Sequence, residues 1–118
     1  MQYLLLIYGN EQNSAAMNEA TANAMMTEYR SFTEGIAKSG HYKGGNALQP
    51  TKTATTVRVR DGKRQMTDGP FAETREQLGG YYLIDAKDLD EAADIAARIP
   101  GARAGSIEIR PIWAMPAA

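Results

Sequence analysis

The sequence of 118 residues contains no cysteine, and it has one histidine and one tryptophan. Without cysteine the chain has no disulfide, no thiol nucleophile and no thiolate metal site. A single histidine excludes sites built from several imidazoles, so we expect neither a resident metal nor an organic cofactor. The formal net charge of -1 provides no basic surface for direct binding of nucleic acid or an anionic membrane.

Long hydrophobic runs are lacking as well. The apolar run at residues 3–8 is too short for the core of a signal peptide or for a membrane span, and we therefore expect a cytoplasmic protein without membrane contact. The composition is ordinary for a globular protein, with 43% apolar and 23% charged residues. This length and composition predict one domain over residues 1–118.

The N-terminal third predicts a buried strand followed by a long helix. The continuous apolar run at 3–8 is typical of a strand buried on both faces. Residues 10–13 are interpreted as a loop, with Ser14 capping a short helical turn at 15–18. The main helix ends at Gly40, and its apolar stripe is explained better by core packing than by a cofactor. The stripe consists of Ala22, Met25, Met26, Tyr29, Phe32 and Ile36.

The middle of the chain predicts a loop and then a hairpin. Residues 41–50 are interpreted as a loop, with or without a strand of two or three residues. Pro50 forces an extended backbone just before it. The β-branched segment 53–60 and the segment 63–67 flank Asp61-Gly62, a strong hairpin turn signal. Valines and arginines alternate along the first of these strands, which predicts a half-exposed ribbon.

The C-terminal third predicts a strand, a helix and a last strand. The apolar segment 78–84 is the second strand that we expect to be buried on both faces. Asp88 and Glu91 form a capping box for a short helix that closes at Pro100-Gly101. The last strand alternates apolar and charged residues. Pro111 cannot donate to a ladder of hydrogen bonds, so this strand is either an edge strand or ends there.

This order of elements predicts an α+β fold, a ferredoxin-like sandwich in which two helices cover one face of an antiparallel sheet. Two helices cover one face only, although two strands are apolar on both faces. The helix-free face therefore needs a cover, and a second copy of the same sheet supplies it. The pattern thus predicts a homodimer.

Four segments resemble one family. They are DGPFAETREQLGGYY at 68–82, LQP at 48–50, ATTVR at 54–58 and EIRP at 108–111. Together they resemble the DGPF group of the YCII-related proteins. The resemblance implies a dimeric α+β barrel with a cleft between the sheet and the partner. Some members of the group are associated with, or joined to, extracytoplasmic-function sigma factors. One domain is expected here, so if this chain has such a partner, the resemblance implies that it is a separate protein.

One departure from the family limits what the resemblance implies about catalysis. The YCII proteins proper resemble enzymes because they place a histidine on the first helix and an aspartate after the second. Tyr29 and the pair Ile99-Pro100 stand near those positions here. A His–Asp catalytic pair is therefore not carried over, and the resemblance leaves open whether the chain is an enzyme.

Three residues are candidates for catalysis: Asp68, Glu73 and Arg110. Asp68 begins a turn, either as a turn former whose carboxylate accepts from nearby amides or as an acid or base oriented by Arg110. Phe71 is expected to anchor this turn in the core. Glu73 and Glu76 share a face if their segment is helical, where they could form an acid–base pair; two solvated carboxylates are the alternative.

The candidates for ligand binding are Tyr29, His41, Phe71, Glu76 and Tyr81. The tyrosines either line a pocket or pack in the core. His41 lies in a glycine-rich segment, where a surface position explains it better than a ligand contact.

Four cations lie close together on the hairpin. They form either a solvated face or a binding surface for an anionic ligand or an acidic protein. They are Arg58, Arg60, Lys63 and Arg64.

Three hypotheses about function follow, each from a different class. The chain binds or converts a small molecule in a cleft between sheet and dimer partner, or it is an interaction module that serves a sigma factor, or it is a dimeric scaffold. A concave cavity with ionisable groups favours the first hypothesis. A closed core with an exposed apolar or charged patch favours the second.

Overall fold

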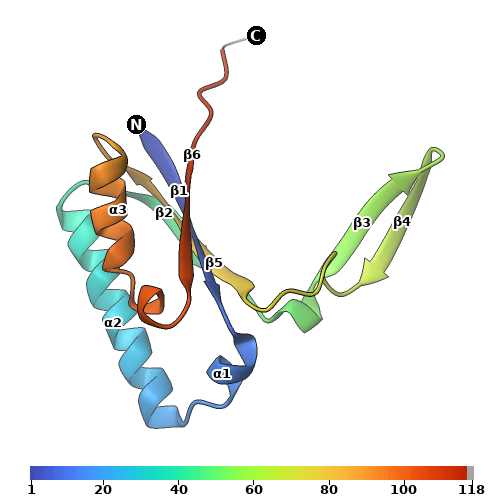
Figure 1. The fold of residues 1–118 in the computed structure, drawn as a ribbon, viewed down its shortest axis with the longest axis horizontal. Coiled ribbons are helices and arrows are strands. Elements are labelled where there is room, and N and C mark those ends of the chain that lie inside the picture. The colour runs from blue at the N-terminus through green and yellow to red at the C-terminus, as the bar shows by residue number, and fades with distance from the viewer. Residues whose placement is uncertain (117–118) are drawn as a thin grey trace.

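The computed structural model describes residues 1–116 (Figure 1). In chain order its elements are β1 (Gln2–Gly9), α1 (Glu11–Ala15), α2 (Glu19–Lys38), β2 (Tyr42–Ala47), the 3₁₀ turn η1 (Thr51–Thr53), β3 (Thr55–Arg60), β4 (Lys63–Asp68), β5 (Gln77–Asp85), α3 (Leu89–Ala97), the 3₁₀ turn η2 (Pro100–Arg103) and β6 (Ser106–Pro111).

Four strands form the main sheet in the order β2-β5-β1-β6, and every neighbouring pair is antiparallel. Helices α2 and α3 lie on the same side of this sheet (Figure 1). The prediction of an α+β fold with two helices on one face of an antiparallel sheet is therefore confirmed. Both alternatives for the last strand hold, because β6 pairs with β1 alone at the edge of the sheet and ends at Pro111.

The hydrophobic core lies between the sheet and the two helices. Its fully buried large side chains are Leu5, Ile36, Ile84, Ile95 and Ile99. The rings of Phe32 and Tyr82 meet edge to face with centroids 5.2 Å apart, a geometry that adds about 0.5–1.5 kcal/mol to the gain from burial. Of the predicted α2 stripe, the last two residues, Phe32 and Ile36, are buried, whereas Met26, nearer the start of the helix, is 62% exposed.

The start of the helical region differs from the prediction. Residues 11–15 form α1, where we expected a loop followed by a helical turn capped by Ser14. The cap is Asn10, whose side-chain oxygen accepts from the amides of Gln12 and Asn13. An asparagine directly after a strand thus begins the helix four residues earlier than predicted.

The predicted end of the main helix is confirmed. Gly40 has a φ of 82°, the left-handed conformation that suits glycine after a helix. The amide of Gly40 donates to the carbonyl of Ala37, and the amide of His41 donates to the carbonyl of Ile36. These two bonds form a Schellman motif, and the chain turns there from α2 into β2.

The segment 41–50, which we interpreted as a loop, contains the six-residue strand β2. The interpretation underestimated this strand because its glycines lower β-propensity. Their role is steric, since a Cβ at Gly45 would lie 2.8 Å from the carbonyl oxygen of Tyr81 on the neighbouring strand. Glycine therefore permits the close approach of β2 to β5.

Strands β3 and β4 form a separate two-stranded hairpin, residues 55–68, which we call the arm. Its turn at Asp61-Gly62 has φ values of 53° and 72°, which confirms the predicted hairpin turn. The arm extends away from the sheet and the helices (Figure 1). It is more exposed than the half-exposed ribbon that we predicted, because no element of the described chain lies under either of its faces.

The root of the arm is fixed to the body of the protein by hydrogen bonds. The carboxylate of Glu11 accepts from the amide and the hydroxyl of Thr51, both at 2.8 Å. The amide of Leu48 donates to the carbonyl of Gly79, so the pairing of β2 with β5 continues to the residue where the chain enters the arm.

Nowhere in residues 1–116 is there a helix long and apolar enough to cross a membrane.

Candidate functional site

The two faces of the main sheet carry different neighbours. Tyr3 and Leu5 of β1 point toward the helices and are buried, whereas Leu4 and Leu6 point to the opposite side. The same alternation holds on β5, where Tyr82 and Ile84 face the helices. We call the helix-free side of the sheet the open face.

The open face has an apolar centre. Strands β1 and β5 are neighbours, and directly opposed residues of an antiparallel pair lie on the same face. The side chains that this register places on the open face are half-buried, with no other part of residues 1–116 packed over them as a layer (Figure 1). They are Leu4, Leu6, Tyr8, Leu78, Tyr81 and Leu83.

Polar groups border this apolar centre. On one side the side-chain amide of Asn46 donates to the hydroxyl of Tyr81 at 2.8 Å. On the edge strand β6, Glu108 and Arg110 lie opposite Leu6 and Leu4, and their charged groups are 4.0 Å apart. This pair is largely exposed, so it contributes little to stability in the single chain and is free to contact a ligand or a partner.

A third polar contact lies at the end of the open face nearest the arm. The hydroxyl of Ser106 donates to the carboxylate of Glu76 at 2.7 Å. Ser106 pairs with Tyr8 across β1 and β6, and Glu76 directly precedes β5. The open face thus combines an apolar floor with carboxylate, guanidinium, amide and phenol groups at its margins.

A small pocket of about 210 Å³ lies at the root of the arm. It is lined by Thr51, Pro70, Ala72, Glu73, Thr74 and Gln77. Of the candidate catalytic residues, Glu73 is the one that lines it. The segment around Glu73 is irregular and not helical, so the shared helical face that we considered for Glu73 and Glu76 does not form.

Asp68 is the last residue of β4, and its side chain is exposed. The turn after it is held by its neighbours, because the amide of Gly69 donates to the carbonyl of Ala54 and the hydroxyl of Thr56 donates to the carbonyl of Gly69. Within residues 1–116, the structure shows neither a hydrogen bond nor an ion pair of the Asp68 carboxylate, and Arg110 is paired with Glu108.

The expectation that Phe71 anchors the turn in the core is wrong. Its side chain is 79% exposed. The physical reason is the position of the turn: it lies at the root of the arm, beyond the end of the sheet, where no core exists for the ring to enter (Figure 1).

Tyr29 lies on the helix side, away from the open face. Its hydroxyl accepts from the amide of Gly101 at 3.1 Å, and burial raises the pKa of the phenol. The same cause raises the pKa of Tyr82, whose hydroxyl is 2.7 Å from that of Thr33. Of the two interpretations left open for Tyr29, the structure places it in contact with the core.

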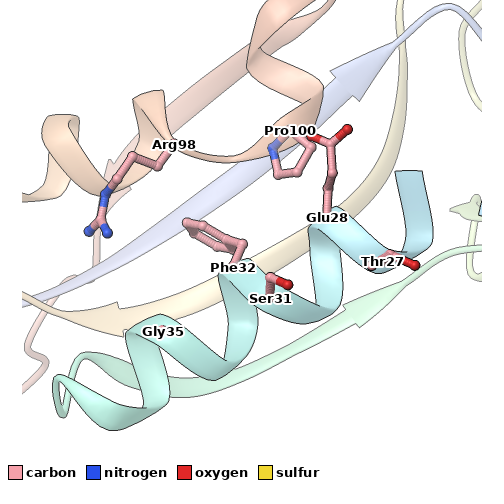
Figure 2. Close-up of a pocket in the computed structure, with 7 residues that line it drawn as sticks. All are labelled: Thr27, Glu28, Ser31, Phe32, Gly35, Arg98 and Pro100. Carbon is pink, nitrogen blue, oxygen red and sulfur yellow. The ribbon is translucent and has the colours of Figure 1, made fainter. Parts of the chain in front are cut away.

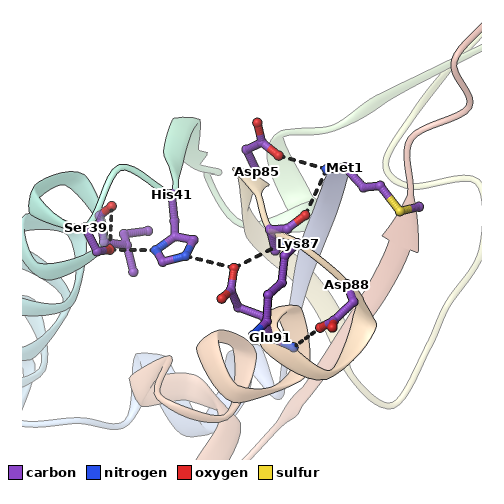
Figure 3. A network of polar contacts seen from close by, with 9 residues as sticks. Met1, Ser39, His41, Asp85, Lys87, Asp88 and Glu91 are labelled. Carbon is purple, nitrogen blue, oxygen red and sulfur yellow. Dashed lines mark hydrogen bonds and ion pairs between the residues drawn. The ribbon is translucent and has the colours of Figure 1, made fainter.

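His41 joins the end of α2 to the start of α3 (Figure 3). Its Nδ1 lies 2.6 Å from the hydroxyl of Ser39, and its Nε2 lies 3.0 Å from a carboxylate oxygen of Glu91. The Lys87 amide, which donates to Glu91, and the nearby His41 ring together hold the pKa of the Glu91 carboxyl below its usual range. Both His41 and Glu91 are half-buried, and their contact joins the chain after α2 to the first turn of α3. We call the contact between His41 and Glu91 the clamp.

The capping of α3 agrees in part with the predicted capping box. Asp88 accepts from the amide of Glu91 as expected. The Glu91 side chain accepts from the amide of Lys87 rather than from that of Asp88. Close by, the N-terminal ammonium group bonds to Asp85 at 3.0 Å and lowers the pKa of that carboxyl (Figure 3).

A larger and shallower pocket, of about 410 Å³, lies between α2 and the segment that follows α3 (Figure 2). Its lining residues are Thr27, Glu28, Ser31, Phe32, Gly35, Arg98 and Pro100. Glu28 forms an ion pair with Arg103 at 2.6 Å. None of the candidate residues predicted from the sequence lines this pocket.

The structure distributes the candidate residues over three places. Tyr81 and Arg110 lie on the open face, Glu76 lies at its end, Asp68, Phe71 and Glu73 lie at the arm root, and Tyr29 and His41 lie on the helix side. Sequence reasoning missed Asn46, Ser106 and Glu108. The alternation of the last strand could have indicated Glu108, whereas Asn46 was placed in a loop. Within residues 1–116, no three side chains of His, Asp or Glu are arranged to hold a metal ion.

Two comparisons bear on what the chain is. The profile of the YCII-related domain matches residues 1–116. A protein of Rhizobium meliloti (strain 1021), "Uncharacterized protein R00369", is 37% identical over 114 residues, which cover 95% of this chain and 92% of that protein.

Proposed function

The chain belongs to the YCII-related domain family, and from that premise we propose that two copies pack through their open faces as a dimeric α+β barrel. A small molecule binds in the cleft between the two sheets, without a metal or organic cofactor. Arg110 and Tyr81 are the predicted site residues that belong to this cleft. Asp68 and Glu73 lie outside it in the single chain.

The apolar centre of the open face is the observation that carries this proposal. Six neighbouring side chains are apolar or aromatic there, although the strands already bury their other face against α2 and α3. An exposed apolar patch on a stable protein is typical of an interface or a ligand site. An apolar floor with a few polar groups at its margin has the composition of small-molecule sites.

Light scattering at micromolar concentration tests the dimer. We expect twice the 12.8 kDa mass of one chain for the wild-type protein. Leu6→Glu places a charge in the centre of the open face and is expected to weaken the dimer on the order of a hundredfold or more. Leu89→Glu is the matched control, because Leu89 is an exposed leucine of α3, and it leaves the dimer intact. A wild-type protein with the mass of a single chain would overturn the proposal.

Native mass spectrometry of the purified dimer tests the ligand. We expect an additional small mass that is lost on unfolding and reduced in Arg110→Gln. Arg103→Gln is the control, since Arg103 is paired with Glu28 on the helix side. An equal loss of the additional mass in both variants would remove Arg110 from the site.

The alternative function is that of an interaction module for an extracytoplasmic-function sigma factor. The basic face of the arm favours it, because Arg58, Arg60 and Lys63 point to the same side of the hairpin and suit an acidic protein surface. Arg64 points to the other side. Co-purification with such a sigma factor, abolished by the double change Arg58→Ser and Arg60→Ser, is the expected outcome for this function.

A further inference from the structure

The arm is joined to the rest of the chain at its root alone. Its two strands pair with each other and with no other strand of residues 1–116. The bonds that hold it in place involve Ala54, Gly69 and Thr51, which all lie at the root. An isolated two-stranded hairpin is marginally stable in water, so an arm of this length needs a surface to pack on.

One face of the arm carries an apolar cluster at its centre. Val57 and Met66 are directly opposed across the hairpin, and Val59 follows on the same face. Their side chains are 55%, 58% and 62% exposed for Val57, Met66 and Val59 respectively. Arg64, opposite Val59, and Asp68, opposite Thr55, border this cluster on the same face, and the opposite face carries the cations Arg58, Arg60 and Lys63. An exposed apolar cluster on one face of a ribbon, with cations on the other, is typical of a segment that packs on another surface through the apolar cluster.

The dimensions of the single chain also indicate a surface that a partner covers. Its accessible surface is 8712 Å², whereas a compact monomer of this mass exposes about 6,300 Å². Its radius of gyration is 16.5 Å, against about 13.5 Å for a compact domain of this length. The excess surface of about 2,400 Å² exceeds the roughly 800 Å² that each partner buries in a standard interface, and it is in the range of large obligate interfaces.

We propose that the apolar face of each arm packs on the body of a second copy of this chain, so that the two subunits exchange arms. This inference rests on the proposed dimer and adds a second contact to it. The arm leaves the sheet where the pairing of β2 with β5 ends, and it extends away from the sheet and the helices (Figure 1). In the proposed dimer the partner packs on the open face, so the arm reaches the body of that partner. One two-fold dimer then covers both apolar surfaces, the open face and the arm.

Methionine oxidation tests the exchange directly, and the chain contains its own control. Met66 on the arm and Met26 on α2 are 58% and 62% exposed in the single chain. Dilute hydrogen peroxide oxidises exposed methionines, and peptide mass spectrometry gives the rate at each site. In the purified wild-type dimer we expect Met66 to react at least about fivefold more slowly than Met26, and in the Leu6→Glu monomer we expect the two rates to be similar.

Variants of the two arm faces provide a second measurement. The double change Val57→Ser and Val59→Ser is expected to raise the dissociation constant of the dimer by about tenfold to a hundredfold. The double change Arg58→Ser and Arg60→Ser on the opposite face is the matched control and leaves this constant within about twofold. Both sets of side chains are exposed in the single chain, so the body folds in both variants, which circular dichroism verifies.

The outcomes separate this inference from the proposed dimer. If Met66 reacts as fast as Met26 in a dimer that Leu6→Glu dissociates, the open-face dimer stands and the arm exchange is wrong. If the wild-type protein is monomeric, both are wrong. If the valine variant and the arginine variant weaken the dimer equally, the arm contact is not made through the apolar face, and the inference is overturned in that form.

Discussion

The two faces of the main sheet come from the same strands, yet the chain closes one of them and leaves the other open. On the helix side, Leu5 and Ile84 are fully buried under α2 and α3. Their immediate neighbours in the two strands, Leu6 and Leu83, point to the other side, where both remain half-buried. The residue types are alike, and the difference lies in what covers them.

This difference shows that the chain encodes more apolar sheet surface than its own helices can cover. A sheet exposed to water on one side usually has polar residues on that side. Here β1 is apolar on both sides, and the charges of the open face lie at its margins, on the edge strand β6 and at Glu76 and Asp85 on the two ends of β5. The hydrophobic pattern is therefore that of a sheet that lies between two layers, of which the single chain supplies one.

The largest effect is expected on the helix side. Ile84→Ala removes a fully buried side chain from the core and is expected to lower the free energy of unfolding by about 2–5 kcal/mol. The loss is the same at every protein concentration, because the cavity forms inside one chain. Urea unfolding at low and at high protein concentration measures it. A loss below about 1 kcal/mol would mean that the core closes around the missing atoms.

Leu83→Ala, the neighbouring change on the open face, sharpens the comparison. We expect a smaller loss of about 1–2 kcal/mol, and we expect it to increase with protein concentration. Association stabilises the folded state by mass action, so a variant with a weaker dimer gains less stability when it is concentrated. Urea unfolding at about 1 and 100 μM tests this. An equal loss at both concentrations would place the role of Leu83 within the single chain.

The order of the main elements followed from hydrophobic pattern and turn chemistry. The apolar segments 3–8 and 78–84, the stop at Gly40, the turn at Asp61-Gly62 and the cap at Asp88 each have a strong local cause, and each lies where we predicted. Strand β2 was underestimated because its glycines serve the packing of β2 against β5, which local propensity does not reveal.

The candidate site was less predictable, because it depends on which side of the sheet a residue faces and where the hairpin points. Tyr29 and Tyr81 are both tyrosines in apolar segments, yet they lie on opposite sides of the sheet. Phe71 was expected in the core because it is the one large apolar residue of its turn. Its exposure follows from the direction of the arm, which the sequence pattern does not specify.

The smallest effect concerns the clamp between the helix ends and depends on pH. Glu91→Gln keeps an oxygen that accepts from the Lys87 amide, but it removes the negative charge beside His41. The pKa of the Glu91 carboxyl is lowered in the folded protein, so its ionised form is stabilised there. This contribution is fully present above the ordinary pKa of a glutamate, and it is lost as the pH falls through the folded pKa.

We therefore expect Glu91→Gln to have a lower melting temperature than the wild-type protein at pH 7 and a difference that shrinks steadily on acidification below about pH 4.5. Thermal unfolding followed by circular dichroism over a pH series measures the difference. Asp94→Asn is the control, because Asp94 is an exposed carboxylate on the same helix. A difference in melting temperature that stays constant from neutral to acidic pH would show that Glu91 acts through packing or geometry and that its charge does not stabilise the contact with His41.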